Sequence, residues 1–272
     1  MSRRRTAADG AAHAARRPRG PRADHETARV RLLQALGVAA VLGGWEAAAR
    51  AGLVDPLFVP APSAVLAALG AMGGSALGAL GETLAKTAVA YAIAAVLGVA
   101  AGVVLGSVPA LRETLHPFVV ALYGMPKILV LPWIVLLLGF GVVPAVVYGA
   151  IHGLFPILLL VLGAVRDVDR TLLTVARAYG ARPWQVYWKV VLPAIVPAVL
   201  ASLRLGIVFC LLGVLIVEMF AGVRGMGHVL NSLANGFQAA RLFAATALVS
   251  AASIAIVLAL DHVSETLSRW RG

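Results

Sequence analysis

Long uncharged stretches separated by short polar breaks dominate the chain from residue 32 onward. Thr87–Leu111 contains 25 residues without a charge, and Ile128–Val165 contains 38. A bilayer accommodates about 20 apolar residues in one helix, so the longer stretch must hold two spans. Gly139, Gly141 and Pro144 interrupt it and mark the break between them. The pattern predicts an all-α polytopic membrane protein.

About six transmembrane helices account for this pattern. They are expected near residues 32–49, 87–107, 117–138, 145–165, 192–220 and 242–260. Between the first two, residues 51–81 are predicted to form a loop and an interfacial helix that begins near Ser63, a residue type that caps helix N-termini. Residues 222–241 are predicted to form a second loop. The chain thus divides into a disordered basic tail (1–30), a first membrane helix (31–54), a core (55–265) and a short second tail (266–272).

Composition and charge agree with a membrane location. Hydrophobic residues make up 61% of the 272 positions and the mean hydropathy is +0.91, which is too apolar for a soluble domain. The net charge is +11, but nine of the 23 Lys and Arg residues fall in the first 31 positions. This tail lacks the interleaved aromatic side chains of a nucleic-acid-binding surface, so no nucleic-acid partner is expected. We expect the tail to set topology and to contact anionic lipid.

The distribution of basic residues predicts the orientation. Six spans put both termini on one side, which carries seventeen basic residues, and the opposite side carries four. The positive-inside rule therefore places both termini and residues 166–189 in the cytoplasm. An Arg-rich start before an apolar run ending in Ala47–Ala49 also resembles a signal peptide. Because several spans follow, an uncleaved first helix is the better interpretation.

Residues 166–189, here called the elbow, form the polar and aromatic segment between the fourth and fifth spans. Gly180 is predicted to end a first helix in the left-handed region of backbone conformation. Pro183 suits the first turn of a second helix, on which Trp184, Tyr187 and Trp188 are expected to share one face. The pattern predicts two short helices parallel to the membrane, either as an interfacial anchor or as a docking surface.

The elbow and its surroundings resemble a known family. Ala176 and Gly180, then nine residues, then Val190-Val191-Leu192-Pro193, look like the permease loop of bacterial ABC importers. That loop reads Glu-Ala-Ala, three residues, Gly, nine residues, Ile, any residue, Leu-Pro; here Thr174 and Val175 replace its first two residues and Val190 replaces Ile. The resemblance covers roughly residues 55–265. Its further motifs look like the nitrate/sulfonate/taurine branch: Pro60–Ser63, Pro126-Lys127, Leu131-Pro132, Gly139–Gly141, Phe155-Pro156, Glu218-Met219 and Gly225–Gly227.

The resemblance implies a type I ABC importer permease fold in a bacterial inner membrane. It also implies a homodimer whose elbow acts as a coupling helix on a separate ATPase chain. A solute-binding protein would deliver a small anionic or polar solute, such as a sulfonate, taurine, nitrate or a pyrimidine. Since Thr174 replaces the usual Glu, any salt bridge from that position is lost. The coupling residues implied are Ala176, Gly180, Ala181, Trp184, Tyr187 and Pro193.

Polar side chains inside the predicted spans are candidates for lining the pathway, because charge within a membrane is costly. Glu218 and Arg204 lie 14 residues apart, which puts them on one helix face but about 21 Å apart along the axis. A helix-packing ion pair is the alternative role for each. Lys127 follows Pro126 and could face a cavity that an anion crosses, or snorkel to the interface. The candidates are Tyr123, Lys127, Arg204 and Glu218.

Two other function classes stay open, a membrane enzyme using His116, His152 and Glu218, and an ion-driven carrier. The sequence contains no Walker-type phosphate loop, His-Glu-x-x-His or Gly-x-Ser-x-Gly motif, so we expect no catalytic residue and no cofactor. Cys210 is the single cysteine, which excludes an intrachain disulfide and a cysteine metal cluster. Missing internal repeats count against the carrier.

Overall fold

The computed structural model describes the backbone of residues 21–222 and 224–268. Within these ranges every regular element is a helix or a helical turn. Five helices are long and apolar enough to cross a membrane, and one bent pair makes a sixth candidate span. The prediction of an all-α polytopic fold with about six spans is confirmed. The chain forms two compact units, residues 1–63 and 64–272.

Helix α1, Pro21–Arg50, is the main element of the first unit. It begins inside the tail that we expected to be disordered as far as residue 30; residues 1–20 lie outside the described part. A proline in the first turn suits a helix start, and the Ala, Glu, Arg and Leu residues after it favour helix. The candidate membrane span within α1, Arg29–Arg50, agrees with the predicted first span over 32–49, and only the helical turns that precede it were not expected.

The end of α1 is tied to the start of α2, Pro62–Ser107. Glu46 accepts hydrogen bonds from Arg50 Nε at 2.5 Å, and from the backbone N–H and the hydroxyl of Ser63 at 3.0 and 2.7 Å. The Glu46 carboxylate thus satisfies a backbone N–H that the first turn of α2 leaves free. Ser63 lies inside that turn and is not the capping residue that the sequence indicated.

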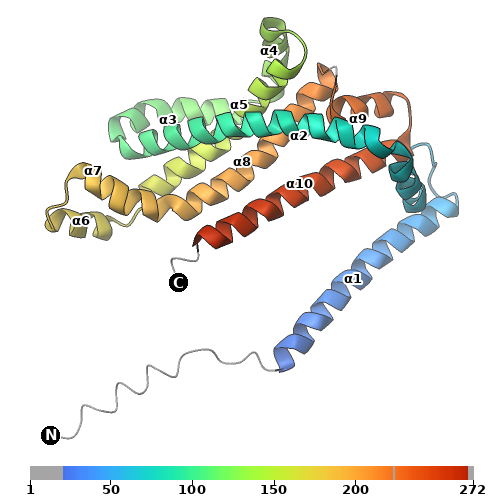
Figure 1. Cartoon of the computed structure of the whole chain (residues 1–272), viewed down its shortest axis with the longest axis horizontal. Helices are drawn as coiled ribbons and strands as arrows, with labels where there is room; N and C mark the ends of the chain where they lie inside the picture. The colour runs from blue at the N-terminus through green and yellow to red at the C-terminus, as the bar shows by residue number, and fades with distance from the viewer. Residues whose placement is uncertain (1–20, 223, 269–272) are drawn as a thin grey trace, which may run out of the picture. The chain divides into compact units, whose positions relative to one another are not determined.

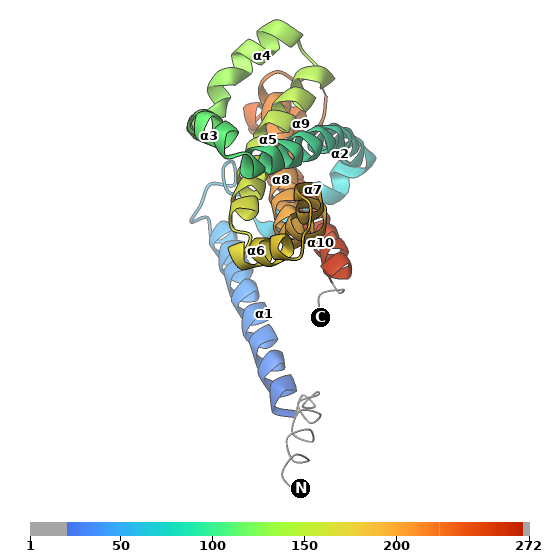
Figure 2. The same cartoon turned by 90° about the vertical axis from the view of Figure 1, so that its left-hand side faces the viewer.

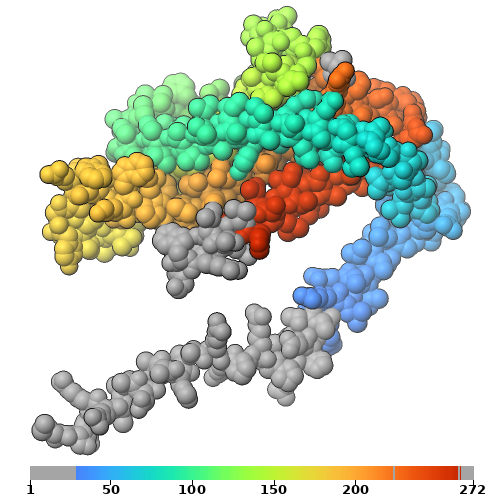
Figure 3. All heavy atoms as spheres, in the orientation of Figure 1, coloured from blue at the N-terminus to red at the C-terminus, as the bar shows by residue number. Residues whose placement is uncertain are grey.

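Helix α2 is longer than the predicted second span. It is interrupted only at Gly73, where φ is 50° and ψ is −140°, a conformation that glycine adopts without a side-chain clash. Most of the predicted loop and interfacial helix over 51–81 is therefore the first part of α2. In the space-filling view α2 crosses one face of the second unit (Figure 3). Buried polar residues, Thr83, Lys86 and Thr87, lie on this helix.

The third predicted span consists of two helices. Helix α3, Pro109–Gly124, is followed by a 3-10 turn, η1 (Lys127–Val130), and by α4, Leu131–Leu138, with a bend of 89°. Pro126 cannot donate a helical hydrogen bond, and it disfavours helical conformation at the residue before it. The expectation of one helix over 117–138 is wrong, whereas the distortion at Pro126 is confirmed. Figure 1 shows α4 projecting from the other helices.

The remaining spans agree with the sequence pattern except at one connection. Helices α5, Val142–Arg166, and α8, Leu192–Phe220, match the fourth and fifth predicted spans, and α10, Ala239–Ser268, contains the sixth. The predicted loop 222–241 instead contains a ten-residue helix, α9, Met226–Asn235. Figures 1 and 2 place α9 at one end of the second unit and the elbow at the other.

Close backbone approach fixes α5 between α2 and α8. On α2, Gly98, Gly102 and Gly106 follow one another at four-residue intervals and face α5. A methyl group on Gly102 would lie 2.7 Å from the Leu158 carbonyl oxygen and 2.8 Å from Val161 Cβ. Small residues at such spacing let helices in a membrane pack backbone against backbone. The main buried cluster, which includes residues of α2, α5 and α8, forms around this contact.

Candidate functional site

The first half of the elbow is a capped helix, α6, Arg170–Ala178. Asp169 precedes it and accepts a hydrogen bond from the Thr171 backbone N–H at 2.7 Å. This bond holds the pKa of the Asp169 carboxyl below its usual value. Thr174, which stands where the family usually has Glu, donates its hydroxyl to the Arg170 carbonyl of its own helix at 2.9 Å.

Gly180 ends α6 in the way that the sequence predicted. Its φ is 76°, in the left-handed region, which confirms its expected conformation. The Gly180 N–H donates to the Arg177 carbonyl at 2.9 Å, and the Ala181 N–H donates to the Ala176 carbonyl at 3.1 Å. These two bonds form a Schellman motif, which satisfies the last carbonyl groups of the helix. Ala176, Gly180 and Ala181 thus act together to set the turn.

The second half of the elbow is continuous with the fifth span. Helix α7, Pro183–Val186, passes through a π-helical turn, η2 (Tyr187–Val191), into α8, so that one helical run extends from Pro183 to Phe220. The Gln185 side chain accepts a hydrogen bond from the Arg182 N–H at 2.9 Å, which fixes the start. Pro193 has no N–H for a regular helical bond, and the preceding turn instead joins the Leu192 N–H to the Tyr187 carbonyl.

The aromatic side chains of the elbow do not share one face. Trp184 and Trp188 are 58% and 63% exposed, whereas Tyr187 is half-buried against the main core cluster. At about 100° per residue, Tyr187 lies about 60° to one side of Trp184 and Trp188 about 40° to the other, so Tyr187 stands at the edge of the exposed face and reaches the core. The predicted common face is therefore wrong for Tyr187. Tyr179, at 89% exposure, joins the two tryptophans as an exposed aromatic residue of the elbow.

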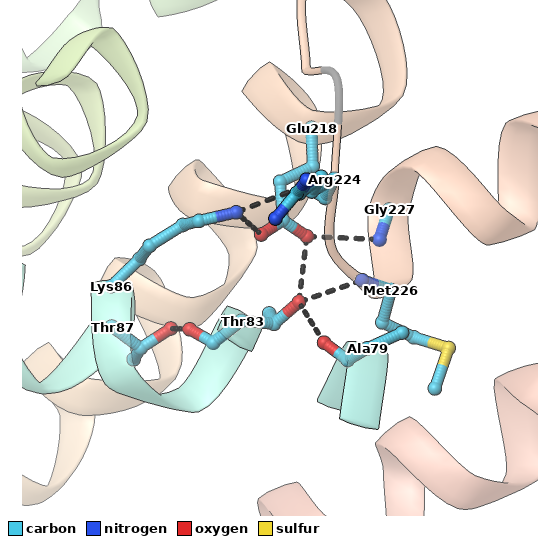
Figure 4. A network of polar contacts seen from close by, with 8 residues as sticks. All are labelled: Ala79, Thr83, Lys86, Thr87, Glu218, Arg224, Met226 and Gly227. Carbon is cyan, nitrogen blue, oxygen red and sulfur yellow. Dashed lines mark hydrogen bonds and ion pairs between the residues drawn. The ribbon is translucent and has the colours of Figure 1, made fainter. Parts of the chain in front are cut away.

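A buried polar network joins α2, α8 and the start of α9 (Figure 4). Lys86 Nζ on α2 donates to Glu218 Oε1 on α8 at 2.8 Å, and to the Arg224 carbonyl at 2.9 Å. Thr83 Oγ1 donates to the other carboxylate oxygen, Oε2, at 2.7 Å. The Gly227 N–H donates to the same oxygen at 2.9 Å, and the Met226 N–H donates to Thr83 Oγ1 at 2.7 Å.

This network explains the Gly225-Met226-Gly227 motif. Gly225 has a φ of 111°, and a methyl group there would lie 2.6 Å from Glu218 Oε2. A methyl group on Gly227 would lie 2.5 Å from the Leu215 carbonyl oxygen. The two glycines therefore leave room for the carboxylate, whose exposure is 1%. The network fixes the connection between α8 and α9 to α2.

Sequence reasoning identified Glu218 but missed Lys86 and Thr83. It treated Lys86 as an outer basic residue, because the second span was expected to begin only at Thr87. Thr83, Lys86 and Thr87 lie three and four residues apart, the spacing of one helical face. That polar face on an apolar helix was the available signal. A cavity of about 530 Å³ opens beside the network, lined in part by Glu82, Lys86 and Arg224.

Arg204 belongs to a separate contact. Its Nε forms an ion pair with Asp261 of α10, and the two side chains are 42% and 31% exposed. Arg204 and Glu218 are thus held by different partners, and pathway lining by these two residues stays a prediction. Among the residues that the structure describes, no group of three His, Cys, Asp or Glu side chains could hold a metal ion.

Lys127 lies at the start of η1, where α3 gives way to α4. Its ammonium group donates to the Tyr123 carbonyl at 3.1 Å and stands 4.7 Å from the centroid of the Tyr123 ring. The Phe155 ring of α5 lies 5.7 Å from the same nitrogen. The structure therefore brings together Tyr123 and Lys127, whereas Arg204 and Glu218 form their ion pairs with Asp261 and Lys86.

Comparison with known proteins assigns the family. The profile of the binding-protein-dependent transport system inner membrane component matches residues 94–270. The taurine transport system permease protein TauC of Escherichia coli K12 is 27% identical over 244 residues, which cover 86% of this chain and 88% of the relative. The glycine betaine/proline betaine permease protein ProW of the same organism is 31% identical over 206 residues, 75% of this chain and 56% of the relative.

Solved structures agree on the fold. The chain is similar to one from inward-facing conformations of the MetNI methionine ABC transporter, with a TM-score of 0.65 and 22% identity. The match covers 72% of this chain and 97% of that one. The family resemblance and the type I permease fold expected from the sequence are confirmed. The chain belongs to the family of binding-protein-dependent transport system inner membrane components and is a membrane-spanning permease subunit of an ABC importer.

Proposed function

We propose that this chain hydrolyses no ATP itself and that its elbow docks on a separate ATPase subunit. The observation that carries the proposal is the continuity of α7 with α8, together with the exposed Trp184 and Trp188 at the free end. A displacement of the elbow would move the whole helix from Pro183 to Phe220. ATP-driven movement of the partner can bias the permease only if its two states bind the elbow differently.

The orientation follows from the charge distribution. The side with the elbow and both tails carries seventeen basic residues against four, so the positive-inside rule puts it in the cytoplasm. An ATPase that uses cytoplasmic ATP can reach the elbow only from that side. The opposite end, with α9 and its network, would then face the solute-binding protein. We further propose that two copies of the chain form the pathway, as the family resemblance implies.

The transported solute is proposed to be small and to carry an acidic group. The names of two relatives give taurine and glycine betaine, which bear a sulfonate and a carboxylate. Both solutes also bear a positive nitrogen. They therefore share an acidic group, although neither solute carries a net charge. Selection among such solutes would rest largely on the solute-binding protein.

The docking proposal is tested at Gly180 in the assembled importer. Valine resists a φ of 76°, whereas asparagine tolerates it, so Gly180→Val should abolish ATPase association and uptake while Gly180→Asn retains both. Gly163→Val is the matched control, because its backbone has an ordinary conformation and no atom lies within 4 Å of the added Cβ. Normal uptake by a properly inserted Gly180→Val protein would refute the docking role.

A carrier that works alone is the competing function. Proteoliposomes that contain only this chain should show no solute uptake under an imposed ion gradient. Uptake should appear when the ATPase, the binding protein and ATP are added. Gradient-driven uptake by the chain alone would exclude the ABC mechanism.

A further inference from the structure

The cavity beside the buried polar network has charged side chains of both signs in its walls. Its volume of about 530 Å³ lies within the range of pockets that bind small molecules, about 300–1,000 Å³. One face of α2, the start of α5 and the connection between α8 and α9 form these walls. Apolar side chains such as Val89 and Val146 alternate there with three ionisable ones, Glu82, Lys86 and Arg224. The pocket can therefore recognise a small polar solute.

Two of the three charges in this pocket have no counter-charge among the described residues. Glu82 and Arg224 are exposed, and none of the ion pairs formed within residues 21–222 and 224–268 includes either side chain. Lys86 differs, because the Glu218 carboxylate already matches its charge. One carboxylate and one guanidinium group are thus left to interact with a ligand.

The buried network holds the backbone beside both free charges. Glu82 directly precedes Thr83, whose hydroxyl donates to the Glu218 carboxylate at 2.7 Å. The Arg224 carbonyl accepts a hydrogen bond from Lys86 Nζ at 2.9 Å (Figure 4). The main chain is therefore fixed at these two positions, whereas the charged ends of the two side chains are exposed. A site that is ordered before its ligand arrives binds it at a lower entropic cost.

The depth of the pocket suits the entry of a solute. Helix α2 ends at Ser107, which lines a separate cavity together with Arg177 and Tyr187 of the elbow. Glu82 and Lys86 precede Ser107 by 25 and 21 residues, or about 38 Å and about 32 Å along the helix. Since the hydrocarbon core of a bilayer is about 30 Å thick, the pocket lies near the membrane surface opposite the elbow. In the proposed orientation this is the surface at which a binding protein would release its solute.

We propose that this pocket is an entry subsite for a zwitterionic solute, in which Arg224 binds the acidic group and Glu82 binds the positive nitrogen. The inference rests on the proposed transport function and specifies a solute that carries both charges. A guanidinium group binds a carboxylate through two parallel N–H groups. A simple anion would bring a second negative group close to Glu82, and a simple cation would bring a second positive group close to Arg224; both arrangements are unfavourable. Only a zwitterion matches both side chains at once.

Binding of taurine to the full-length chain in lipid nanodiscs tests the subsite. Two probes of similar shape each lack one charge: isethionate has a hydroxyl group in place of the ammonium group, and aminoethyl methyl sulfone has a methyl group in place of one sulfonate oxygen. Saturation-transfer NMR should show that both bind more weakly than taurine, by about threefold to tenfold. Glu82→Gln should weaken taurine binding by a similar factor without weakening isethionate binding. Arg224→Gln should weaken the binding of both.

Matched controls separate the subsite from general effects of charge. Glu113→Gln removes an exposed carboxylate from α3, and Arg241→Gln removes an exposed guanidinium group from α10. Neither residue lines the pocket, so both variants should keep the taurine affinity within about twofold. Equal binding of the three probes to the unmodified chain, or no detectable binding of taurine, would overturn the inference without any variant.

The variants also distinguish the subsite from a protein-docking surface. Unchanged taurine affinity in a folded Glu82→Gln protein would overturn the inference. If Arg224→Gln lowered the affinity for the solute-binding protein but not for taurine, Arg224 would belong to a docking surface, and the subsite would again be refuted. Because the nanodiscs contain no ATPase, none of these results would bear on ATPase docking, which the Gly180 variants test separately.

Discussion

Lys86 on α2 and Glu218 on α8 form an ion pair of 2.8 Å whose side chains are 10% and 1% exposed. Thr83 and the Gly227 N–H complete the coordination of the carboxylate, so both of its oxygens are satisfied. The pair joins residues 132 positions apart in the chain. It therefore fixes the connection between α8 and α9 against α2.

Removing one partner of this pair should strongly destabilise the protein. Lys86→Met leaves the Glu218 carboxylate buried without a counter-charge, which costs about 3 kcal/mol or more. The double variant Lys86→Met with Glu218→Leu should recover part of that loss, because no charge is then left buried. Thermal unfolding in detergent gives both values. A Lys86→Met protein that melts at the same temperature as the unmodified protein would contradict the structural role of the ion pair.

Glycine spacing on α2 provides a test of the helix packing. Gly102→Val should destabilise the contact with α5, since even the first added carbon would lie 2.7 Å from the Leu158 carbonyl oxygen. Overpacking of this kind typically costs about 1–3 kcal/mol. Gly81→Val on the same helix is the control, because no atom lies within 4 Å of its added Cβ. Equal melting temperatures for the two variants would show that α2 does not approach α5 so closely.

The cap at Asp169 should make the start of α6 sensitive to acid. The Thr171 N–H lowers the pKa of the Asp169 carboxyl, so the cap contributes above the unfolded pKa and is lost as the pH falls through the folded value. At pH values below about 4, the hydrogen-exchange protection of the Thr171 N–H, corrected for the intrinsic rate, should therefore decrease. Asp169→Asn keeps a capping oxygen without titrating, and its protection should not change with pH. The same acid-induced loss in Asp169→Asn would assign it to another group.

The sequence predicted well those features that depend on local pattern. The fifth span and the left-handed Gly180 follow from hydrophobic length and from a glycine at a helix end. The length of α2 and the helix α9 were missed, because many Gly and Ala residues weakened the apolar signal. Helix α9 begins where Met226 and Gly227 donate to Thr83 and Glu218, partners more than 130 residues away or on the preceding helix. Such a start cannot be inferred from neighbouring residues.

In the candidate site as well, local pattern identified single residues but not the distant residues that surround them. Lys127 and Glu218 were identified because a charge inside a span is conspicuous. Their environments differ: Glu218 forms a buried salt bridge with Lys86, whereas the Lys127 ammonium contacts a backbone carbonyl and two aromatic rings. Helix periodicity does not distinguish these cases, since the partner of Glu218 lies on α2 and Lys127 stands at the 89° bend after α3.

Cross-linking of the elbow to the ATPase tests the central claim most directly. Cys210 is the single cysteine of the chain and is buried, so replacing it by Ala gives a background for cysteines placed at Trp184 or, at the opposite end, Phe237. In the assembled importer, Trp184→Cys should cross-link to the ATPase with an efficiency that changes when ATP binds, and Phe237→Cys should not cross-link. Absence of a cross-link at Trp184 in a complex that transports solute, or equal cross-linking at Phe237, would contradict the account.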